Sequence, residues 1–428
     1  MLGLTRYQWL VLFAAWLGWG FDVFDGLLFN FVAPICVPNL LHLAPGAPAT
    51  QKVVFIWTAA LTSVILIGWA IGGILFGRVT DRLGRSRTLL FTMLTYAIGT
   101  AACAFAPNIW VLTLFRFISG LGIGGEWAAG ATLVAESMPP GRRVVTGSLL
   151  YTSASAGLFL ATIVNDTLTH RLTVIASDPS LSWRAVFLTG LIPAAVAVAI
   201  RYNIKEPEAW QPSDAPAVAA LFEPPVRRRT LGGLAMSFVA LITWWSSSTF
   251  IQVVASNLAV KLKLSPAEFA ATRAHFIAIG SNAFNVGGLV GTLLNIPIAK
   301  LGRRNLYRIY YTASVGALLV TFVPDWPPET RLWLMGTLGL TVFGVFGSFP
   351  FYLPELFPMR LRGTGGGFTY NVGRIVTAPF PFAVGALVRG GADPLAVMSW
   401  LAVIPAIGAV LAFLGAPVET LGEPEFQE

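Results

Sequence analysis

The chain has 428 residues, of which 55% are hydrophobic and 11% are charged, and its mean hydropathy is +0.71. A soluble domain carries about 25% charged residues, so this composition excludes an ordinary water-soluble enzyme and indicates that lipid is the solvent for much of the surface. The net charge of +8 lies in short loops between apolar runs, which is typical of membrane topology signals and argues against a nucleic-acid-binding protein.

The apolar runs are long enough to cross a bilayer as helices, which takes about 20 residues each. They are continuous rather than alternating, which favours helices over the strands of a barrel. Twelve spans are predicted, at residues 9–34, 53–77, 88–106, 110–137, 146–166, 185–203, 230–256, 273–298, 306–323, 331–353, 364–387 and 394–415. The predicted fold class is therefore an all-α membrane protein with twelve transmembrane helices.

Lysine and arginine concentrate in alternate loops, beginning with Arg6 before the first span. Loops rich in these residues stay in the cytoplasm, so we expect a multi-pass protein of a bacterial inner or plasma membrane with both termini cytoplasmic. Residues 204–229 are rich in proline and end in three arginines. This segment is predicted to be a cytoplasmic linker between an N-terminal half, 1–203, and a C-terminal half, 230–428.

An internal repeat supports this division. The second span is followed by Asp81-Arg82-Leu-Gly-Arg85, and the eighth by Ala-Lys-Leu-Gly-Arg303. Glu136 closes the fourth span and Glu355 closes the tenth, each a few residues ahead of a proline. Repeats of this kind are typical of transporters whose substrate site lies near the membrane midplane, where the repeats meet.

Four stretches resemble motifs of the major facilitator superfamily. The loop from Gly77 to Arg87 resembles the signature loop of that superfamily, and the loop after the eighth span resembles a copy that lacks the aspartate. The stretch Arg116 to Trp127 is similar to the helix 4 motif, and Pro354 to Arg362 to the helix 10 exit. The resemblance covers the whole chain, and it implies two six-helix halves that work by alternating access.

Three further runs resemble one branch of that superfamily. They are Trp19 to Gly26, Gly124 to Trp127, and Asn371 to Arg374, and they look like those of proton symporters for metabolites, sialate and small carboxylates, including aromatic acids. The fifth span lacks the Gly-Pro pattern typical of drug/proton antiporters. The resemblance implies proton-coupled import of a small organic anion, such as lactate, an aromatic acid or sialate. A sugar or drug carrier of the same fold and a non-transporting membrane receptor remain alternatives.

Acidic residues inside predicted spans are candidates for proton coupling, because charges in a bilayer are costly and rarely kept without a function. Asp22 and Asp25 are three residues apart in the first span, so they share a helix face. Asp25 aligns with the helix 1 aspartate of related symporters and is the preferred proton carrier; a structural acid paired with a basic neighbour is the alternative. Glu126 is either a second proton site or a hydrogen-bond partner in helix packing.

Two arginines lie well inside predicted spans, away from the span ends. The resemblance implies that Arg116 pairs with the acid of helix 1, and we hypothesise that protonation of Asp25 breaks this pair; the alternative is that Arg116 extends to the membrane interface. Arg374 lies about midway along the eleventh span at a rise of about 1.5 Å per residue. It could bind a substrate carboxylate bidentately, or it could form a fixed salt bridge to Glu126 or Asp25.

Polar and aromatic residues of three C-terminal spans could line a substrate cavity, although such side chains often only bond neighbouring helices. The candidates are Trp244, Trp245 and Gln252 of the seventh span, Asn282 and Asn285 of the eighth, and Tyr370 and Asn371 of the eleventh.

The cytoplasmic motifs suggest a gate. Asp81 is expected to face the amino-terminal end of the eleventh span, where the helix dipole favours a negative charge. We expect a latch that holds an outward-facing state; for its arginines, a purely topological charge is the alternative. The candidate gating residues are Asp81, Arg82, Arg85, Glu136, Arg143, Glu355 and Arg362.

Other chemistry is not predicted. The glycine run from Gly120 to Gly125 lies inside an apolar span with no strand before it, so it is not a dinucleotide-binding loop. No Walker A sequence, metal-ligand spacing or hydrolase triad is found. We therefore expect no cofactor, no metal and no enzymatic activity. The expected partners are a small organic anion, protons and the lipid bilayer, and the chain is expected to act as a monomer.

Overall fold

The computed structural model describes residues 3–43, 48–168, 172–206, 218–377 and 390–420, with positions 379, 380, 383, 384 and 387 between the last two ranges. Helices dominate this part of the chain, and no strand occurs in it. Among the described residues, seven helices are long and apolar enough to cross a membrane. Helical segments also lie at the other predicted spans, among them α1 (Arg6–Leu40), which has 35 residues. The prediction of an all-α membrane protein is confirmed. Residues 207–217 of the predicted linker lie outside the described residues.

The chain separates into two compact units, each described by itself. Unit 1 comprises Met1–Arg143, Ser153–Leu221 and Phe357–Ile375, and unit 2 comprises Val144–Thr152, Phe222–Leu356 and Val376–Glu428. These units are defined by which residues contact one another, whereas the predicted halves, 1–203 and 230–428, are defined by the sequence repeat. The halves remain a prediction.

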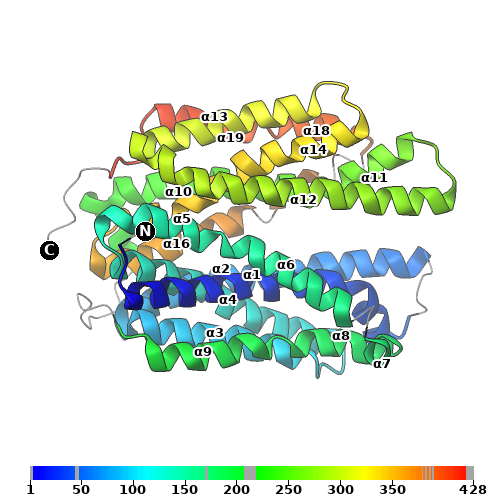
Figure 1. Ribbon diagram of the computed structural model, residues 1–428, viewed down its shortest axis with the longest axis horizontal. Helices are drawn as coiled ribbons and strands as arrows, with labels where there is room; N and C mark the ends of the chain where they lie inside the picture. Colours follow the sequence, from blue (N-terminus) through cyan, green and yellow to red (C-terminus); the bar gives the residue numbers. More distant parts are fainter. Residues whose placement is uncertain are drawn as a thin grey trace. The chain divides into compact units, whose positions relative to one another are not determined.

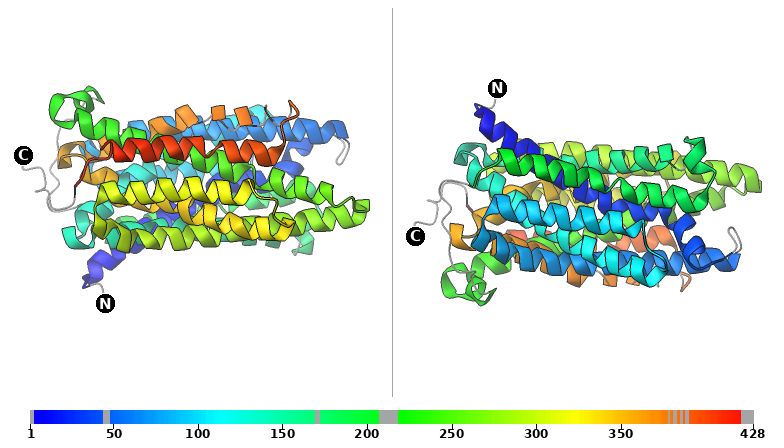
Figure 2. Two further views of the ribbon diagram at one scale, coloured as in Figure 1. Left: turned by 90° about the horizontal axis from the view of Figure 1, so that it is seen from above. Right: turned by 90° about the horizontal axis from the view of Figure 1, so that it is seen from below.

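Unit 1 holds the N-terminal helices and most of the eleventh span. Its helices are α1 (Arg6–Leu40), α2 (Pro48–Leu83), α3 (Arg85–Cys103), α4 (Ile109–Ser137), α6 (Ser153–Asp166), α7 (Thr173–Ala176), α8 (Pro179–Leu188), α9 (Leu191–Asn203) and most of α16 (Arg362–Thr377). Figures 1 and 2 show α3 running beside α9, and α4 also packs on α1, α2 and α3.

Glycines let α2 and α4 approach closely. A Cβ atom on Gly72 would overlap the main chain of Leu121, and one on Gly124 would overlap the main chain of Trp69. The apolar spans therefore pack backbone against backbone at these points, which is a common way for helices to associate in lipid. The glycine run of α4 is a packing feature.

Unit 2 holds the helices of the seventh to tenth and twelfth spans and most of α5. Its helices are α5 (Arg143–Tyr151), α10 (Pro224–Thr249), α11 (Ile251–Lys261), α12 (Pro266–Ile298), α13 (Arg303–Phe322), α14 (Pro328–Leu338), α15 (Phe349–Glu355), α18 (Pro394–Trp400) and α19 (Val403–Phe413). In this unit α12 packs along α14, and α13 packs along α19 (Figure 1).

The tenth span is not one regular helix. After α14 the chain forms a π-helical turn at Gly339–Phe343 and a 3-10 turn at Gly344–Ser348, and then continues as α15. Two proline residues in α15 and three glycines in this stretch weaken regular helix formation. The sequence predicted the span but not the change of helix type.

Candidate functional site

Two acidic side chains meet inside unit 1. Asp22 of α1 and Glu126 of α4 are buried, and their carboxyl groups lie against each other. Neither carboxyl group has a hydrogen-bond donor among the described residues. Glu126 extends over Gly18 of α1, where a Cβ atom would overlap its carboxylate. Two negative charges in contact in a dry interior repel each other, so this pair is suited to hold a proton between them.

Tyr96 of α3 joins this cluster, although the sequence did not single it out. Its side chain is fully buried and interacts electrostatically with Asp22, Asp25 and Glu126. Its hydroxyl has no hydrogen-bond partner in the described chain. One tyrosine in an apolar span gives little signal by itself. Only the packing of α3 on α1 and α4 reveals its neighbours.

Arg116 does not form the side-chain pair with Asp25 that the sequence suggested. Its guanidinium donates to the main-chain oxygens of Asp25, at 3.3 Å, and Gly26, at 3.2 Å, and lies over the ring of Phe29. No ion pair joins it to the Asp25 carboxylate in the described residues, although the two groups attract each other electrostatically. The arginine is 1% exposed, so it does not extend to an interface either. Arg116 therefore binds main-chain carbonyl groups of α1 and not the expected carboxylate.

Arg374 of α16 lies between two aromatic rings. Its guanidinium is 3.8 Å from the centre of the Trp69 ring and 4.5 Å from that of Tyr370. Asn371 accepts a hydrogen bond from Nη1 at 2.9 Å and donates its own amide hydrogen to the main-chain oxygen of Gly367 at 2.8 Å. The amide therefore orients the guanidinium, whose planar face matches the flat rings.

The acid that interacts electrostatically with Arg374 is Asp22. The salt bridge to Glu126 or Asp25 considered from the sequence is not formed in the described part of the chain. Arg374 is 5% exposed, so its charge acts in an environment of low dielectric. It thus links the acidic pair of α1 and α4 to the aromatic residues of α16.

A series of aromatic rings continues from Tyr370. Trp127 stacks on Tyr370 with ring centres 4.3 Å apart and planes 20° apart, and Trp19 meets Trp127 edge to face at 6.0 Å. The runs that carry the branch resemblance, at Trp19, Trp127 and Arg374, therefore come together in one place. Their spacing in the sequence gave no sign of this contact.

The other cavity candidates belong to unit 2. Trp244 and Trp245 meet edge to face at 4.7 Å, and Trp244 also stacks on Phe343 at 6.0 Å. Asn282 is exposed and Asn285 is half-buried. The side chain of Gln252 lies outside what the structure describes. The cavity-lining role of all these residues stays a prediction.

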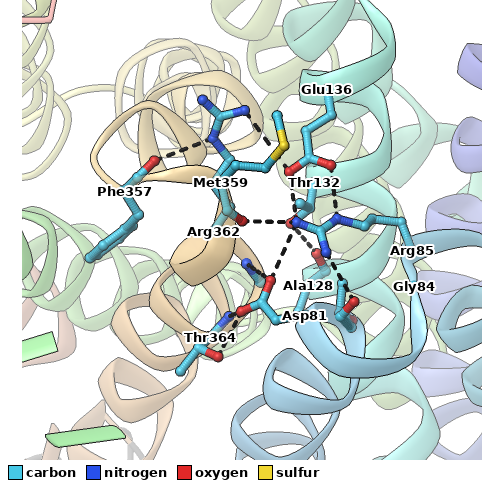
Figure 3. A network of polar contacts seen from close by, with 12 residues as sticks. Asp81, Gly84, Arg85, Ala128, Thr132, Glu136, Phe357, Met359, Arg362 and Thr364 are labelled. Atoms are coloured by element: carbon cyan, nitrogen blue, oxygen red, sulfur yellow. Dashed lines mark hydrogen bonds and ion pairs between the residues drawn. The ribbon is translucent and has the colours of Figure 1, made fainter. Parts of the chain in front are cut away.

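Asp81 caps the amino-terminal end of α16 (Figure 3). Its carboxylate accepts hydrogen bonds from the main-chain nitrogens of Gly363, at 3.1 Å, and Thr364, at 2.8 Å, and from the Thr364 hydroxyl at 2.7 Å. The expected contact is confirmed. Its physical basis is the positive end of the helix dipole together with unpaired main-chain donors.

Arg85 is the centre of the same network. Figure 3 shows its guanidinium between Glu136, which it binds through two hydrogen bonds of 2.8 and 2.9 Å, and the main-chain oxygen of Met359 at 2.9 Å. Asp81 forms an ion pair with it at 3.4 Å. Burial by itself lowers the pKa of Arg85, but the nearby carboxylates, above all Glu136, outweigh it and raise the pKa. The guanidinium therefore stays charged.

The remaining gating candidates differ in whether they belong to this network. Arg362 lies 3.9 Å from Glu136 and donates to the main-chain oxygen of Phe357, so it belongs to the network. Arg143 donates to the main-chain oxygen of Ala135. Arg82 is exposed and makes none of these contacts among the described residues, so its gating role stays a prediction.

Unit 2 contains a second version of this arrangement. Arg303 donates to both oxygens of Glu355, at 3.0 and 2.9 Å, as Arg85 does to Glu136. The hydroxyl of Thr420 also donates to Glu355, at 2.7 Å. The repeat read from the sequence therefore corresponds to a repeated ion pair.

Two acids that sequence reasoning missed complete the networks. Glu206 accepts hydrogen bonds from the main-chain nitrogens of Arg85, Ser86 and Arg87 at the start of α3. Glu419 accepts from those of Arg303 and Arg304 at the start of α13. Each acid follows the last helix of a predicted half, and that shared position was the available signal.

Comparison with known proteins identifies relatives along the whole chain. The family model described as Major Facilitator Superfamily matches residues 9–381. The "Cis,cis-muconate transport protein" of Acinetobacter baylyi is 29% identical over 77% of this chain and 78% of its own. The "Probable 4-methylmuconolactone transporter" of Cupriavidus pinatubonensis is 28% identical over 96% and 92%. The solved structure of the proton:xylose symporter XylE has the same fold, with a TM-score of 0.76, 15% identity and 98% of both chains covered.

Proposed function

The chain belongs to the major facilitator superfamily, and from that premise we propose that it is a proton-coupled symporter that imports a small organic anion by alternating access. The observation that carries this proposal is the position of Arg374, which is oriented by Asn371, enclosed by Trp69 and Tyr370, and attracted to Asp22. Muconate and methylmuconolactone appear in the names of relatives, and both are small organic acids.

Arg374 is suited to bind the carboxylate of the substrate. A guanidinium offers two parallel donors, which match the two oxygens of a carboxylate. The guanidinium lies over the rings of Trp69 and Tyr370, and these flat contacts together with the hydrogen bond to Asn371 restrict its orientation. The adjacent aromatic series favours a monocarboxylate with a flat, apolar body, such as an aromatic or dienoic acid.

In this proposal, proton binding and substrate binding are coupled because Asp22 and the substrate anion compete for the positive charge of Arg374. When Asp22 is ionised, its charge attracts Arg374 and opposes the approach of an anionic substrate. A proton taken up by the Asp22–Glu126 pair removes that charge, so the anion binds more tightly when the proton is present. By linkage the anion also tightens binding of the proton, and the two cross the membrane together.

The proposal also needs a conformational change, and the network of Asp81, Arg85, Glu136 and Arg362, here called the latch, is the part of the structure that we expect to control it. Asp81 and Arg85 hold the start of α16 within unit 1 through hydrogen bonds and ion pairs. These contacts must break if α16 is to move in the transport cycle, so the latch biases the equilibrium between the two access states. Glu136 and Arg362 act in the same way.

The basic loops support a cytoplasmic position for the latch and both termini, and the bacterial relatives support a bacterial inner membrane. The chain holds both repeats, so one copy suffices for transport. Labelling of single cysteines at residues 3 and 420 from either side of intact cells tests the orientation, and the mass of the purified protein in detergent tests the monomer.

Uptake into proteoliposomes tests the function. The substrates are radiolabelled muconate, benzoate, lactate, sialate and xylose, with and without an inward proton gradient, for the wild type, Arg374→Ala and the control Arg308→Ala. Arg308 is a partly buried arginine of α13 that hydrogen-bonds the main chain of Ala412. We expect gradient-driven accumulation of an acid in the wild type and the control, and none in Arg374→Ala. Accumulation of xylose alone, or uptake that ignores the gradient, would contradict the proposal.

A further inference from the structure

The indole of Trp127 carries a hydrogen-bond donor that no group in the described part of the chain accepts. The side chain is 2% exposed, and its Nε1 atom is buried without a partner among the described residues. Most buried N–H groups in proteins have an acceptor, because water otherwise solvates them better than the protein does. A ligand that brings its own acceptor is a physical reason to keep such a donor.

Trp127 packs on the face of α16 that carries Arg374. Gly366, Tyr370 and Arg374 follow one another at intervals of four residues, so they share this face. The Cζ3 atom of the indole is 3.8 Å from the Cβ position of Gly366, and the indole stacks on Tyr370 with ring centres 4.3 Å apart. The guanidinium of Arg374 is 4.5 Å from the centre of the same tyrosine ring. One aromatic ring therefore separates the indole from the arginine that we assign to the substrate carboxylate.

The N–H group of Trp127 is directed away from Gly366. Cζ3 and Nε1 lie on opposite edges of an indole, so the contact of Cζ3 with α16 turns the N–H edge away from that main chain. Trp19 meets the indole edge to face at 6.0 Å. In the described residues the contacts of this ring are therefore aromatic or carbon groups, and the donor is left for a ligand.

The acidic pair decides which kind of acceptor fits. Glu126 precedes Trp127 in α4 and extends over Gly18, while Trp127 itself contacts Trp19, the next residue of α1. A second carboxylate at the indole would therefore meet the negative charge of the acidic pair in a medium of low dielectric. A carbonyl oxygen accepts the same hydrogen bond and brings no net charge.

We propose that Trp127 is a specificity-determining residue whose indole N–H donates to an uncharged oxygen of the substrate, at the end opposite its carboxylate. The substrate is then a monocarboxylate with a ketone, ester or lactone carbonyl across a ring or diene from the acid group. Trp69 also has a buried indole nitrogen without a partner in the described chain. It lies against the guanidinium of Arg374, at 3.8 Å, and so belongs to the carboxylate end.

This inference rests on the proposed function and deepens it, since it names the class of acid. Arg374 and Trp127 are both buried, so the substrate reaches them when α16 moves. Asp81 of the latch holds the start of α16 through the main-chain nitrogens of Gly363 and Thr364. Opening of the latch therefore exposes both ends of the substrate site together.

A matched pair of acids tests the class. 4-Acetylbenzoate and 4-isopropylbenzoate have nearly the same shape, but only the first carries a carbonyl oxygen opposite its carboxylate. Isothermal titration calorimetry on the protein in detergent gives a dissociation constant for each. We expect the wild type to bind 4-acetylbenzoate about tenfold more tightly, as one hydrogen bond to a buried donor provides. Terephthalate has a second carboxylate in that place and should bind more weakly than 4-acetylbenzoate.

Trp127→Phe removes the N–H group and keeps a ring that can stack on Tyr370. We expect the ratio of the two dissociation constants to fall to about one, while the affinity for 4-isopropylbenzoate stays within about twofold of wild type. The matched control is Trp183→Phe in α8, which removes a fully buried indole whose N–H already donates to Asn39 at 3.2 Å. This control should keep the wild-type ratio.

Trp69→Phe separates the two indoles. It acts at the carboxylate end, so it should weaken the binding of both acids alike and keep the ratio of about tenfold. A ratio that is lost in Trp69→Phe would assign the donor to Trp69 and overturn the inference. This variant and the wild-type ratio decide the question even if Trp127→Phe does not fold.

Three further results overturn the inference. The wild type binds the two substituted benzoates equally or binds neither, Trp127→Phe weakens both alike and keeps their ratio, or terephthalate binds more tightly than 4-acetylbenzoate. Failure of the proposed symport is a separate result, because uptake by the wild type would then ignore the proton gradient. The binding constants are measured without a gradient and do not depend on it.

Discussion

Asp22 of α1 and Glu126 of α4 lie against each other in the interior of unit 1, more than a hundred residues apart in the chain. Neither carboxyl group has a donor among the described residues, so each is the other's main polar neighbour. The pair lies beside Gly18, whose missing side chain gives Glu126 its space. This contact joins two separate acids into the pair that we propose binds the transported proton.

Glu126→Gln should uncouple transport without unfolding the protein. The amide can donate a hydrogen bond to Asp22, so the repulsion between two carboxylates disappears and the thermal midpoint in detergent should stay equal or rise. Gradient-driven accumulation should be lost while counterflow exchange persists. Glu329→Gln, at the exposed start of α14, is the control and should accumulate substrate like the wild type. Full accumulation by Glu126→Gln would remove Glu126 from the proton site.

Arg374→Lys should weaken substrate binding at least about tenfold, or about 1.4 kcal/mol, because an ammonium group cannot form two parallel hydrogen bonds or lie flat between rings. Trp69 lies against the guanidinium, so quenching of tryptophan fluorescence on titration with the transported acid measures the affinity. Arg308→Lys serves as the matched substitution. An unchanged dissociation constant in Arg374→Lys would show that the paired N–H donors of the guanidinium do not bind the substrate.

Asp81→Ala should shift the conformational equilibrium. It removes three hydrogen bonds at the start of α16, and loss of a helix cap costs about 0.5–2 kcal/mol. Asp178→Ala removes a comparable cap at the start of α8 and is the control for stability alone. Cytoplasmic labelling of a cysteine at position 366 should accelerate in Asp81→Ala and not in Asp178→Ala. Equal labelling in both variants would mean that the cap stabilises the helix without gating.

Gly124→Ala should destabilise the protein, because its new methyl group would overlap the main chain of Trp69. Overpacking of this kind costs about 1–3 kcal/mol. Gly316→Ala in α13 is the matched control, since nothing lies within 4 Å of its added Cβ and alanine favours helix by about 0.5–1 kcal/mol. The thermal midpoint should fall in the first variant and hold or rise in the second. A stable Gly124→Ala would show that α2 and α4 can separate without loss.

The sequence by itself determined the fold class and the location of most motif residues. Twenty-residue apolar runs can only be helices in lipid, because each main-chain polar group must be bonded within its own segment. The repeated loops marked the equivalent positions of Arg85 and Arg303, and the structure shows that each of these arginines forms an ion pair with a glutamate. Because the helix dipole favours a negative charge there, Asp81 could be assigned to the start of α16.

Only the tertiary structure decided which intramembrane groups meet. Asp25 was expected to pair with Arg116, yet that arginine bonds main-chain oxygens of α1, while Asp22 meets Glu126. Tyr96 gave no signal at all. Spacing within one helix shows which residues share a face, but the rotation and depth of that helix against its neighbours depend on side-chain packing along its whole length. In unit 1, close contacts at glycines such as Gly72 and Gly124 constrain that rotation, and through it which side chains make up the proposed proton site.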